Sequence, residues 1–339
     1  MGPSGTTLRG TSRPLAERHD AALLDLDGVV YRGAGLIPHA AEAIDGAKAA
    51  GMRLAYVTNN ASRTPDEVAA QLRELGVKAE AADVVTSAQA AAHLVADRVP
   101  PGSAVLVVGG DGIVAALAER GLRPVRSLAD GPVAVVQGYA PDVDWWQLAE
   151  GSYAVNAGLL WVATNTDLTI PTARGIAPGN GTLVQAVRTA TGQDPVVAGK
   201  PELPLHREAV ARTAAHDPLV VGDRLDTDIE GAVRAGSPSL LVLTGVTDPA
   251  ALLAAPPPRR PTYLAADLRG LVQPHPTVTR SEDGFRCEGW RAWPNGTEVA
   301  LDGDGDSVDG LRALCVAAWW LPGDAATVTA TKPLARLGW

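Results

Sequence analysis

The sequence has few aromatic residues, two cysteines and no long apolar run among its 339 residues. Two cysteines are too few for a disulfide framework or a thiolate zinc site. No apolar segment reaches the roughly 18 residues that a membrane-spanning helix needs. The first 19 residues are polar and basic and lack the apolar core of a secretory signal. We therefore expect a cytoplasmic protein without a membrane span.

Basic residues are also in short supply. Lysine and arginine total 29 against 38 aspartates and glutamates, which gives a net charge of −9. A chain with this balance and no block of basic residues lacks the electrostatic footprint of a nucleic-acid binder, so we expect no nucleic-acid partner. Four of the 29 are lysines, which makes each lysine a candidate for a specific role. The sequence leaves open whether the chain forms a homo-oligomer.

The scarce residue types gather near the C-terminus. The single phenylalanine, both cysteines and five of the eight tryptophans follow residue 274. This shift in composition predicts a separate C-terminal subdomain over residues 274–339. We expect strands over 284–293 and 296–301, a helix over 308–320 and a strand over 326–331, a pattern that resembles a fragment of an acetyltransferase-like (GNAT) fold. We interpret this small α+β unit as a stabilising element or a surface for an interaction partner.

The rest of the chain is rich in short apolar runs that alternate with amphipathic stretches. Helices are expected between these runs, for example over 40–50 and from Pro65, where Thr64 and Glu67 form a capping box, to Gly76. Near-continuous apolar strands followed by helices indicate parallel sheets covered on both faces, so the fold class is α/β. The predicted strands are 21–27, 53–59, 105–108, 133–136, 159–163, 196–198, 219–221 and 239–243.

Polar residues follow several of these strands. Asp25 and Asp27 end the first strand, and their spacing of two places both carboxylates on the same side of the chain. Ligands bind where the carboxyl ends of parallel strands meet. Each polar group by itself is also consistent with a turn or a helix cap; their occurrence after successive strands indicates a site. The others are Thr58, Asn59 and Asn60, then Lys200, then Asp223 and Asp228.

These segments resemble the four motifs of the haloacid dehalogenase (HAD) phosphatase superfamily. The matching segments read DLDGVVY, TNN, GKP and GDRLDTDI, and the resemblance spans roughly residues 20–272. The long insertion between TNN and GKP is similar to that of the NagD-like, or p-nitrophenylphosphatase-like, branch, which carries a large α/β cap. The resemblance implies a Rossmann-like core over 18–84 and 192–273 and a cap over 85–191. The aromatic tail resembles that of glycerol 3-phosphate phosphatases in this branch.

The resemblance also implies a chemistry. It is the Mg²⁺-dependent hydrolysis of a small phosphomonoester through an aspartyl-phosphate on Asp25, with Asp27 as general acid and base. The residues that the resemblance implies for binding the phosphoryl group are Thr58, Asn59, Asn60 and Lys200. The magnesium ligands are Asp25, the main-chain carbonyl of Asp27, Asp223 and Asp228, the last either directly or through water.

Substrate choice is expected from the cap segment TNTDLTIPTAR, with Asn165, Asp167, Ile170 and Arg174 as candidates. In the alternative reading, Asn165 and Asp167 only form a turn and Arg174 is a surface residue. We interpret Trp145 and Trp146 as packing residues of a cap helix.

The resemblance makes glycerol 3-phosphate the first substrate to test. Phosphoglycolate, nucleoside monophosphates and pyridoxal phosphate are alternatives within the phosphatases. A phosphomutase also fits the two aspartates. A metabolite-binding sensor with little turnover is the alternative from a different class.

Overall fold

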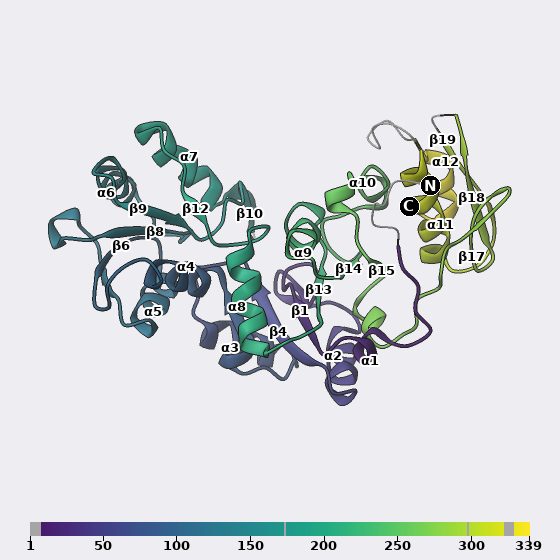
Figure 1. Ribbon diagram of the computed structural model, residues 1–339, viewed down its shortest axis with the longest axis horizontal. Coiled ribbons are helices and arrows are strands. Elements are labelled where there is room, and N and C mark those ends of the chain that lie inside the picture. Colours follow the sequence, from purple (N-terminus) through teal and green to yellow (C-terminus); the bar gives the residue numbers. More distant parts are fainter. Residues whose placement is uncertain (1–7, 173, 297, 322–328) are drawn as a thin grey trace. The chain divides into compact units, whose positions relative to one another are not determined.

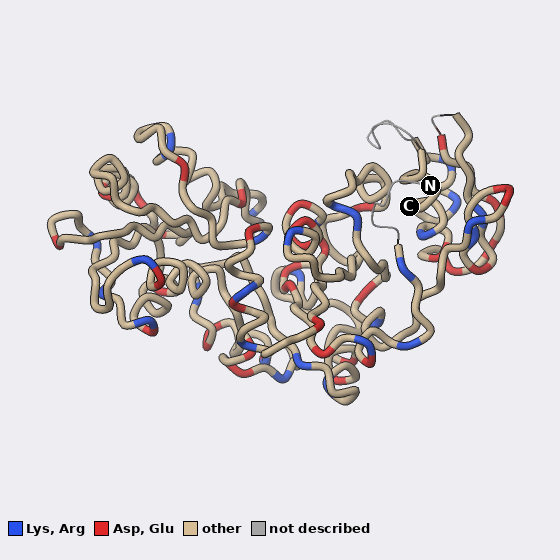
Figure 2. The backbone as a smooth tube through the Cα atoms, in the orientation of Figure 1, with Lys and Arg blue, Asp and Glu red and all other residues tan. Residues whose placement is uncertain are grey.

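The computed structural model describes residues 8–172, 174–296, 298–321 and 329–339. The chain divides into two compact units, one formed by Met1–Leu54 with Ala215–Trp339 and the other by Ala55–Ala214. Both contain parallel strands alternating with helices, which confirms the predicted α/β class. Within the described ranges, no helix is long and apolar enough to cross a membrane. Basic and acidic residues are interspersed along the chain (Figure 2).

The first unit is built around parallel strands with apolar sequences. β1 (Ala21–Leu24) pairs with β13 (Pro218–Gly222), which pairs with β14 (Ser239–Val242), which pairs with β15 (Tyr263–Ala265). All residues of β1 and β14 are buried, as expected for strands of a covered sheet. The remaining elements here are α1 (Leu15–Arg18), β2 (Tyr31–Arg32), β3 (Gly35–Leu36), α2 (Ala40–Ala49), α9 (Glu230–Ala235) and α10 (Pro249–Leu253).

The C-terminal segment of this unit forms an antiparallel sheet covered by a helix. Helix α11 (Ser307–Trp320) lies against the sheet (Figure 1). Its bounds agree with the predicted helix over 308–320 to within one residue. Glu288 adopts a positive φ of 48° and divides the predicted strand 284–293 into two, a turn that no Asn-Gly signal announced. The strands are β16 (Thr279–Ser281), β17 (Gly284–Cys287), β18 (Trp290–Asn295) and β19 (Glu298–Gly303).

The predicted strand over 326–331 lies mostly outside the described residues. Thr329 forms an isolated bridge with Glu298. The expectation is wrong at its end, because Thr331 begins helix α12 (Thr331–Leu337).

This C-terminal segment shares one hydrophobic core with the parallel sheet. Leu241, Leu252 and Leu264 pack in the same cluster as Trp290 and Leu314. The buried Arg312 of α11 forms an ion pair with Asp309 and donates a hydrogen bond to the carbonyl of Leu264 in β15. The segment is therefore joined to the sheet by both apolar packing and a buried polar contact, which supports a stabilising role.

The second unit contains most of β4 (Arg53–Thr58), which pairs in parallel with β5 (Val84–Thr86), and a five-stranded parallel sheet in the order β12-β9-β8-β6-β7. Thr64 caps α3 with the predicted capping box. Helices α6 and α7 lie on one side of the five-stranded sheet, and α4 and α5 lie on the other (Figure 1). The strands are β6 (Ala104–Val108), β7 (Arg123–Val125), β8 (Ala134–Gln137), β9 (Leu160–Ala163) and β12 (Val196–Val197), with the hairpin β10 (Thr169–Thr172) and β11 (Gly175–Pro178). The helices are α3 (Pro65–Glu74), α4 (Ser87–Ala96), α5 (Asp111–Glu119), α6 (Trp145–Asn156), α7 (Asn180–Thr191) and α8 (Leu203–Thr213).

Two features of this unit differ from simple expectation. β12 pairs with β9, so the strand before Lys200 continues the sheet that lies within the predicted cap. Trp145 and Trp146 are 64% and 70% exposed and contact each other edge to face, so their interpretation as packing residues is wrong. Both tryptophans stand at the start of α6, before its buried face begins at Ala149.

Candidate active site

Three aspartates of the first unit come together directly after two neighbouring strands. Asp25 follows β1, and its N–H donates to Val221 of β13 at 2.8 Å. Asp223 follows β13, and a π-helical turn over Leu225–Ile229 presents Asp228. One carboxylate oxygen of each aspartate lies within 4.8 Å of the other two. The sequence spacing thus produces a compact group of carboxylates at the carboxyl ends of parallel strands.

The main chain around Asp223 is fitted closely to its carboxylate. Oδ2 accepts the N–H of Val246 at 2.6 Å, and Asp223 is 1% exposed. A Cβ on Gly245 would lie 1.8 Å from the same oxygen, so only glycine allows this approach. Oδ2 of Asp228, which is 2% exposed, accepts the N–H of Arg224 at 3.1 Å. Both carboxylates are therefore held in defined orientations.

The donor set matches the ion implied by the sequence. Mg²⁺ is bound by hard oxygen ligands, usually one or two carboxylates together with water. Asp25, Asp223 and Asp228 offer such oxygens in one place, and Gly245 provides the space that the orientation of Asp223 requires. The residues present thus fit a magnesium ion.

Asp27 lies in the tight turn that follows β1. It is exposed, it bridges to Tyr31, and the N–H of Gly28 donates to the carbonyl of Tyr31 at 2.8 Å. Its carboxylate is not a member of the three-aspartate group. The structure therefore separates the two aspartates of the first motif, one within the carboxylate group and the other in the adjoining turn.

The second unit contains the four predicted phosphoryl-binding residues, Thr58, Asn59, Asn60 and Lys200. The buried Thr58 ends β4, and its Oγ1 accepts the N–H of Asn60 at 3.1 Å. Oδ1 of Asn60 in turn accepts hydrogen bonds from both the N–H and the hydroxyl of Ser62, at 2.9 and 2.7 Å. The side chain of Asn60 thus shapes the turn that leads toward α3.

Asn59 contacts Lys200 directly. Its Oδ1 accepts the N–H of Lys200 at 2.8 Å, and its Nδ2 donates to the carbonyl of Lys200 at 3.2 Å. The ammonium group of Lys200 extends back along β4, where it donates to the carbonyl of Val57 at 3.4 Å. Two predicted site residues separated by 141 positions therefore meet through both main chain and side chain.

Of the four cap candidates, Asn165 and Asp167 join this group. Nδ2 of Asn165 donates to the carbonyl of Asn59 at 2.7 Å, and Asp167 accepts from Nδ2 of Asn59 at 3.1 Å. Oδ1 of Asn165 also accepts the N–H of Asp167 at 3.1 Å. The two residues therefore also form the turn that the sequence offered as their alternative role. The other two lie on the β10–β11 hairpin, with Ile170 half-buried on β10 and Arg174 exposed at the bend.

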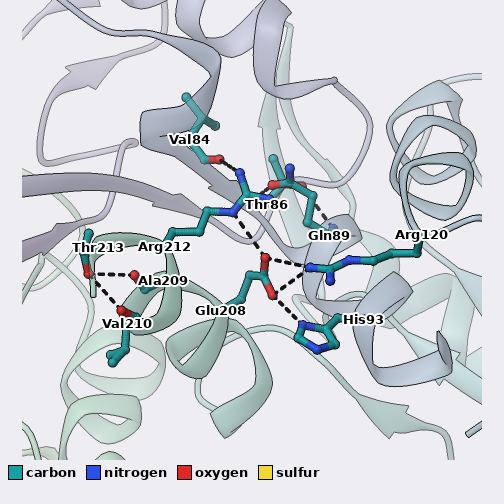
Figure 3. Close-up of polar contacts among 10 residues, drawn as sticks. All are labelled: Val84, Thr86, Gln89, His93, Arg120, Glu208, Ala209, Val210, Arg212 and Thr213. Carbon is teal, nitrogen blue, oxygen red and sulfur yellow. Dashed lines mark hydrogen bonds and ion pairs between the residues drawn. The ribbon is translucent and has the colours of Figure 1, made fainter. Parts of the chain in front are cut away.

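Helix α8, which begins three residues after Lys200, is anchored by a buried carboxylate (Figure 3). Glu208 is 5% exposed and accepts hydrogen bonds from His93 at 2.7 Å, Arg120 at 3.1 Å and Arg212 at 3.2 Å. Burial raises the pKa of Glu208, but hydrogen bonds from His93 and Arg212 and the charges of Arg120 and Arg212 outweigh it, so the pKa lies below its ordinary value. The ionised Glu208 thereby ties α8 to α4 and to the end of α5.

The sequence of this chain is similar to those of known hydrolases. A haloacid dehalogenase-like hydrolase family model matches residues 22–123, and a HAD-hydrolase-like model matches residues 197–271. The chain is 48% identical over 316 residues to the D-glycerol 3-phosphate phosphatase of Mycobacterium tuberculosis, covering 91% of this chain and 88% of that protein. The chain belongs to the haloacid dehalogenase-like hydrolases.

Solved structures of HAD-like hydrolases agree with this placement. The crystal structure of a glycerol phosphate phosphatase from Mycobacterium tuberculosis in complex with magnesium matches with a TM-score of 0.86 and 45% identity, covering 96% of this chain and 98% of that one. The p-nitrophenyl phosphatase from Archaeoglobus fulgidus matches with a TM-score of 0.70 and 28% identity, covering 75% of this chain and 98% of its own. The recognition of the p-nitrophenylphosphatase-like branch is thus confirmed.

The C-terminal segment of this HAD-like hydrolase has a match of its own. Residues 287–339 match the model of a GCN5-related N-acetyltransferase like domain. The resemblance stated for the tail is therefore confirmed over most of its length.

Sequence reasoning missed three contributors to the site of this HAD-like hydrolase. Ser87 donates its hydroxyl to the carbonyl of Asn59 at 2.6 Å, and Asn180 donates its Nδ2 to the carbonyl of Asn165 at 2.6 Å. Gly245 makes room for Asp223. Asn180 lies in the segment PGNG after the hairpin, which offered a signal, whereas Ser87 and Gly245 become recognisable only through their tertiary contacts.

Proposed function

We propose that this chain is a Mg²⁺-dependent phosphatase that hydrolyses a small phosphomonoester, with glycerol 3-phosphate as the substrate. The observation that carries the proposal is the group formed by Asp25, Asp223 and Asp228 after β1 and β13. The 48% identity to the D-glycerol 3-phosphate phosphatase supports the choice of substrate.

In the first step of the proposed reaction, the carboxylate of Asp25 attacks the phosphorus atom. A carboxylate is already ionised at neutral pH and needs no activating base, but it must approach a dianionic phosphate. Asp25, Asp223 and Asp228, together with the main-chain carbonyl of Asp27, would hold the magnesium ion. A bound Mg²⁺ ion offsets the repulsion between the carboxylate and the phosphoryl oxygens. The bond to the leaving oxygen breaks as the Asp25–phosphorus bond forms, which yields an aspartyl-phosphate.

The remaining roles are assigned to Asp27, Lys200 and Thr58. Asp27 donates a proton to the leaving alkoxide and later accepts one from the water that hydrolyses the aspartyl-phosphate. Its exposure in the turn after β1 supports this assignment, because the group that takes a proton from the attacking water must be within reach of that water. Lys200 contributes positive charge toward the phosphoryl group, and the hydroxyl of Thr58 contributes a hydrogen bond.

The domain assignment is part of the same proposal. Residues 18–84 and 192–273 form the catalytic core, except for β12, which continues the sheet of the cap. Residues 85–191 form the cap, and residues 274–339 form the C-terminal subdomain. The free thiols Cys287 and Cys315 are both buried, which fits a reducing compartment, and we place the enzyme in the cytoplasm. The substrate is a small metabolite, and no nucleic acid takes part.

The test is a kinetic screen of phosphate esters with Mg²⁺, in which wild type and Asp25→Asn are compared by kcat/KM. Glycerol 3-phosphate should rank among the best substrates against phosphoglycolate, nucleoside monophosphates and pyridoxal phosphate. Asp25→Asn should abolish turnover of all of them. Unchanged turnover in the variant would contradict the mechanism, and a low rank of glycerol 3-phosphate would contradict only the substrate. Binding without turnover in the wild type would favour a sensor.

The tail is proposed to stabilise the first unit and to offer its exposed Trp320 and Trp339 to an interaction partner. Deletion of residues 275–339 removes the neighbours of Leu241, Leu252 and Leu264 in the shared core. We expect the truncated protein to lose its cooperative thermal transition or to aggregate. A monodisperse and active remainder would contradict the stabilising role.

A further inference from the structure

The side-chain amide of Asn59 pairs with the main chain of Lys200 on both sides. Oδ1 accepts the N–H of Lys200 at 2.8 Å, and Nδ2 donates to the carbonyl of the same residue at 3.2 Å. A side-chain amide has one acceptor and one donor group, and here they match the donor and acceptor of one backbone residue. Two hydrogen bonds to a single residue restrict both the position and the orientation of its backbone.

Asp167 determines which way the amide of Asn59 points. An ionised carboxylate only accepts hydrogen bonds, so the atom of Asn59 that faces Asp167 must be the nitrogen. Nδ2 lies 3.1 Å from one carboxylate oxygen of Asp167 and 3.4 Å from the other. Oδ1 is thereby directed to the N–H of Lys200. Asp167 thus acts on the Asn59–Lys200 pair through the orientation of the amide.

The backbone of Asn59 is itself held in place. Its carbonyl accepts hydrogen bonds from the hydroxyl of Ser87 at 2.6 Å and from Nδ2 of Asn165 at 2.7 Å. Asn165 is buried, and its own carbonyl accepts Nδ2 of the buried Asn180 at 2.6 Å. Lys200 is therefore attached to a network of amides that spans β4, the end of β9 and the start of α7.

The residue before Lys200 packs against the same network. A Cβ on Gly199 would lie 2.4 Å from the carbonyl oxygen of Thr164 and 2.6 Å from Oδ1 of Asn59. Real Cβ atoms do not approach so closely, so a glycine is required where the chain reaches Asn59. The close fit and the paired hydrogen bonds fix the chain at 199–200 from two sides.

We propose that Asn59 is a positioning residue whose side chain fixes the backbone of Lys200, with Asp167 fixing the orientation of Asn59. This replaces the expectation that the Asn59 side chain binds the phosphoryl group. The inference rests on the proposed function, because the catalytic value of Lys200 depends on phosphoryl transfer. A lysine ammonium stands at the end of a flexible four-carbon stem, so its range is limited chiefly by its backbone anchor.

The first test measures the contact itself, without substrate. The sequence contains four lysines, so selective ¹⁵N-lysine labelling yields four backbone amide signals, from Lys48, Lys78, Lys200 and Lys332. In Asn59→Ala, the hydrogen-exchange rate of the Lys200 amide should rise about tenfold, in line with the loss of one hydrogen bond. The other three signals serve as internal references. Asn156→Ala, on the exposed end of α6, is the matched control and should leave all four unchanged.

The second test separates the two hydrogen bonds. Asn59→Asp keeps an acceptor for the Lys200 N–H but places a carboxylate against Asp167 and the Lys200 carbonyl. The Lys200 amide should stay protected in this variant while kcat falls. Adding Asp167→Asn restores a donor at that position, and the double variant should recover about tenfold in kcat over Asn59→Asp, as expected for coupled neighbours.

Steady-state kinetics supply a third readout. Asn59→Ala should lower kcat about 10²-fold, the size of loss that a 1 Å misplacement in an active site can cause. KM should change much less, because the displaced charge acts mainly in the transition state. Inorganic phosphate, titrated calorimetrically, should bind Asn59→Ala more tightly than it binds Lys200→Ala.

Two results would overturn the proposal. One is an unchanged exchange rate of the Lys200 amide in Asn59→Ala. The other is a loss of inorganic phosphate binding as large as that of Lys200→Ala, which would make Asn59 a direct ligand. If wild type hydrolyses no phosphate ester, the proposed function fails, and the exchange measurement still decides whether Asn59 holds Lys200.

Discussion

Buried carboxylates occur in both units of the chain, and their surroundings differ. In the second unit, Glu208 accepts hydrogen bonds from His93, Arg120 and Arg212 (Figure 3). In the first unit, Asp223 and Asp228 are buried beside a third carboxylate, Asp25. A carboxylate surrounded by basic side chains has its charge offset within the chain. Carboxylate oxygens within 4.8 Å of one another repel, and a divalent cation bound among them offsets this repulsion.

Structural and functional carboxylates of this protein should differ in what is lost when their charge is removed. Removing the charge of Glu208 should cost stability, because three donors lose their partner. Removing a charge from the aspartate group should cost activity above all, because it weakens the site that would bind the ion.

The largest effect is expected for Asp223→Asn. The variant should lose at least about 10²-fold in kcat/KM for its best phosphate ester, because a directly ligating oxygen matters no less than the outer partners of metal sites. Mg²⁺ should raise the Tm of wild type and leave that of the variant nearly unchanged, since only binding to the folded state shifts the Tm. Calorimetric scans with and without Mg²⁺ provide the measurement. A Tm without Mg²⁺ well below that of wild type would show that Asp223 serves stability.

A second prediction concerns the space around Asp223. Gly245→Ala places a Cβ 1.8 Å from Oδ2 unless the chain moves, so kcat/KM should fall about 10²-fold. Gly35→Ala is the matched control, because its nearest neighbour lies 3.8 Å away at ordinary contact distance. Equal activities of the two variants would show that the orientation of Asp223 is not critical.

A third prediction tests the other side of the comparison. Glu208→Gln keeps the size of the side chain but removes the charge that three donors share, so the free energy of unfolding should fall by about 2 kcal/mol after allowance for the partial exposure of the partners. The exposed Glu42 pairs with His39 at 3.4 Å, and Glu42→Gln should cost less than about 0.5 kcal/mol. Urea denaturation of both variants provides the comparison. If the two variants were equally stable, the charge of Glu208 would not stabilise the fold.

The smallest effect is expected in how the stability contributed by Glu208 depends on pH. The pKa of Glu208 in the folded state lies below its ordinary value of 4.5, so the unfolded state binds a proton first as the pH falls. The stability that Glu208 contributes is therefore fully present above pH 4.5 and is lost as the pH falls through the folded-state pKa. The stability difference between wild type and Glu208→Gln should shrink below this pH, as measured by urea denaturation at a series of pH values. A constant difference would contradict the assignment.

Much of the fold could be predicted because local sequence controls it. Apolar runs such as 53–59 and 219–221 became β4 and β13 within a residue or two, and the capping box at Thr64 opens α3 as expected. Strand ends could be predicted for the same reason, which placed Asp25 and Asp223 at the ends of two strands, whereas the pairing of these strands is known only from the structure. The turn at Glu288 could not, because its positive φ has no residue signal.

The candidate site was predicted in its residues but not in all of its contacts. The sequence identified Asn59, Lys200, Asn165 and Asp167, yet nothing in it indicated that the Asn59 amide would pair with the backbone of Lys200. Ser87 and Gly245 have no local pattern that distinguishes them from other serines and glycines. Trp145 and Trp146 were expected to pack, but helical periodicity shows that one face is apolar without showing what covers it.

The amino-acid sequence was enough to establish the α/β class, the strand ends that carry acidic residues and the shift in composition after residue 274. These depend on periodicity and composition, which are local properties of a chain. The tertiary fold set which polar groups meet. It brought three aspartates together in one unit, surrounded Glu208 with basic side chains in the other, and joined the C-terminal segment to β15 through Arg312. Hydrogen bonds and ion pairs between distant residues depend on ångström distances that folding alone creates.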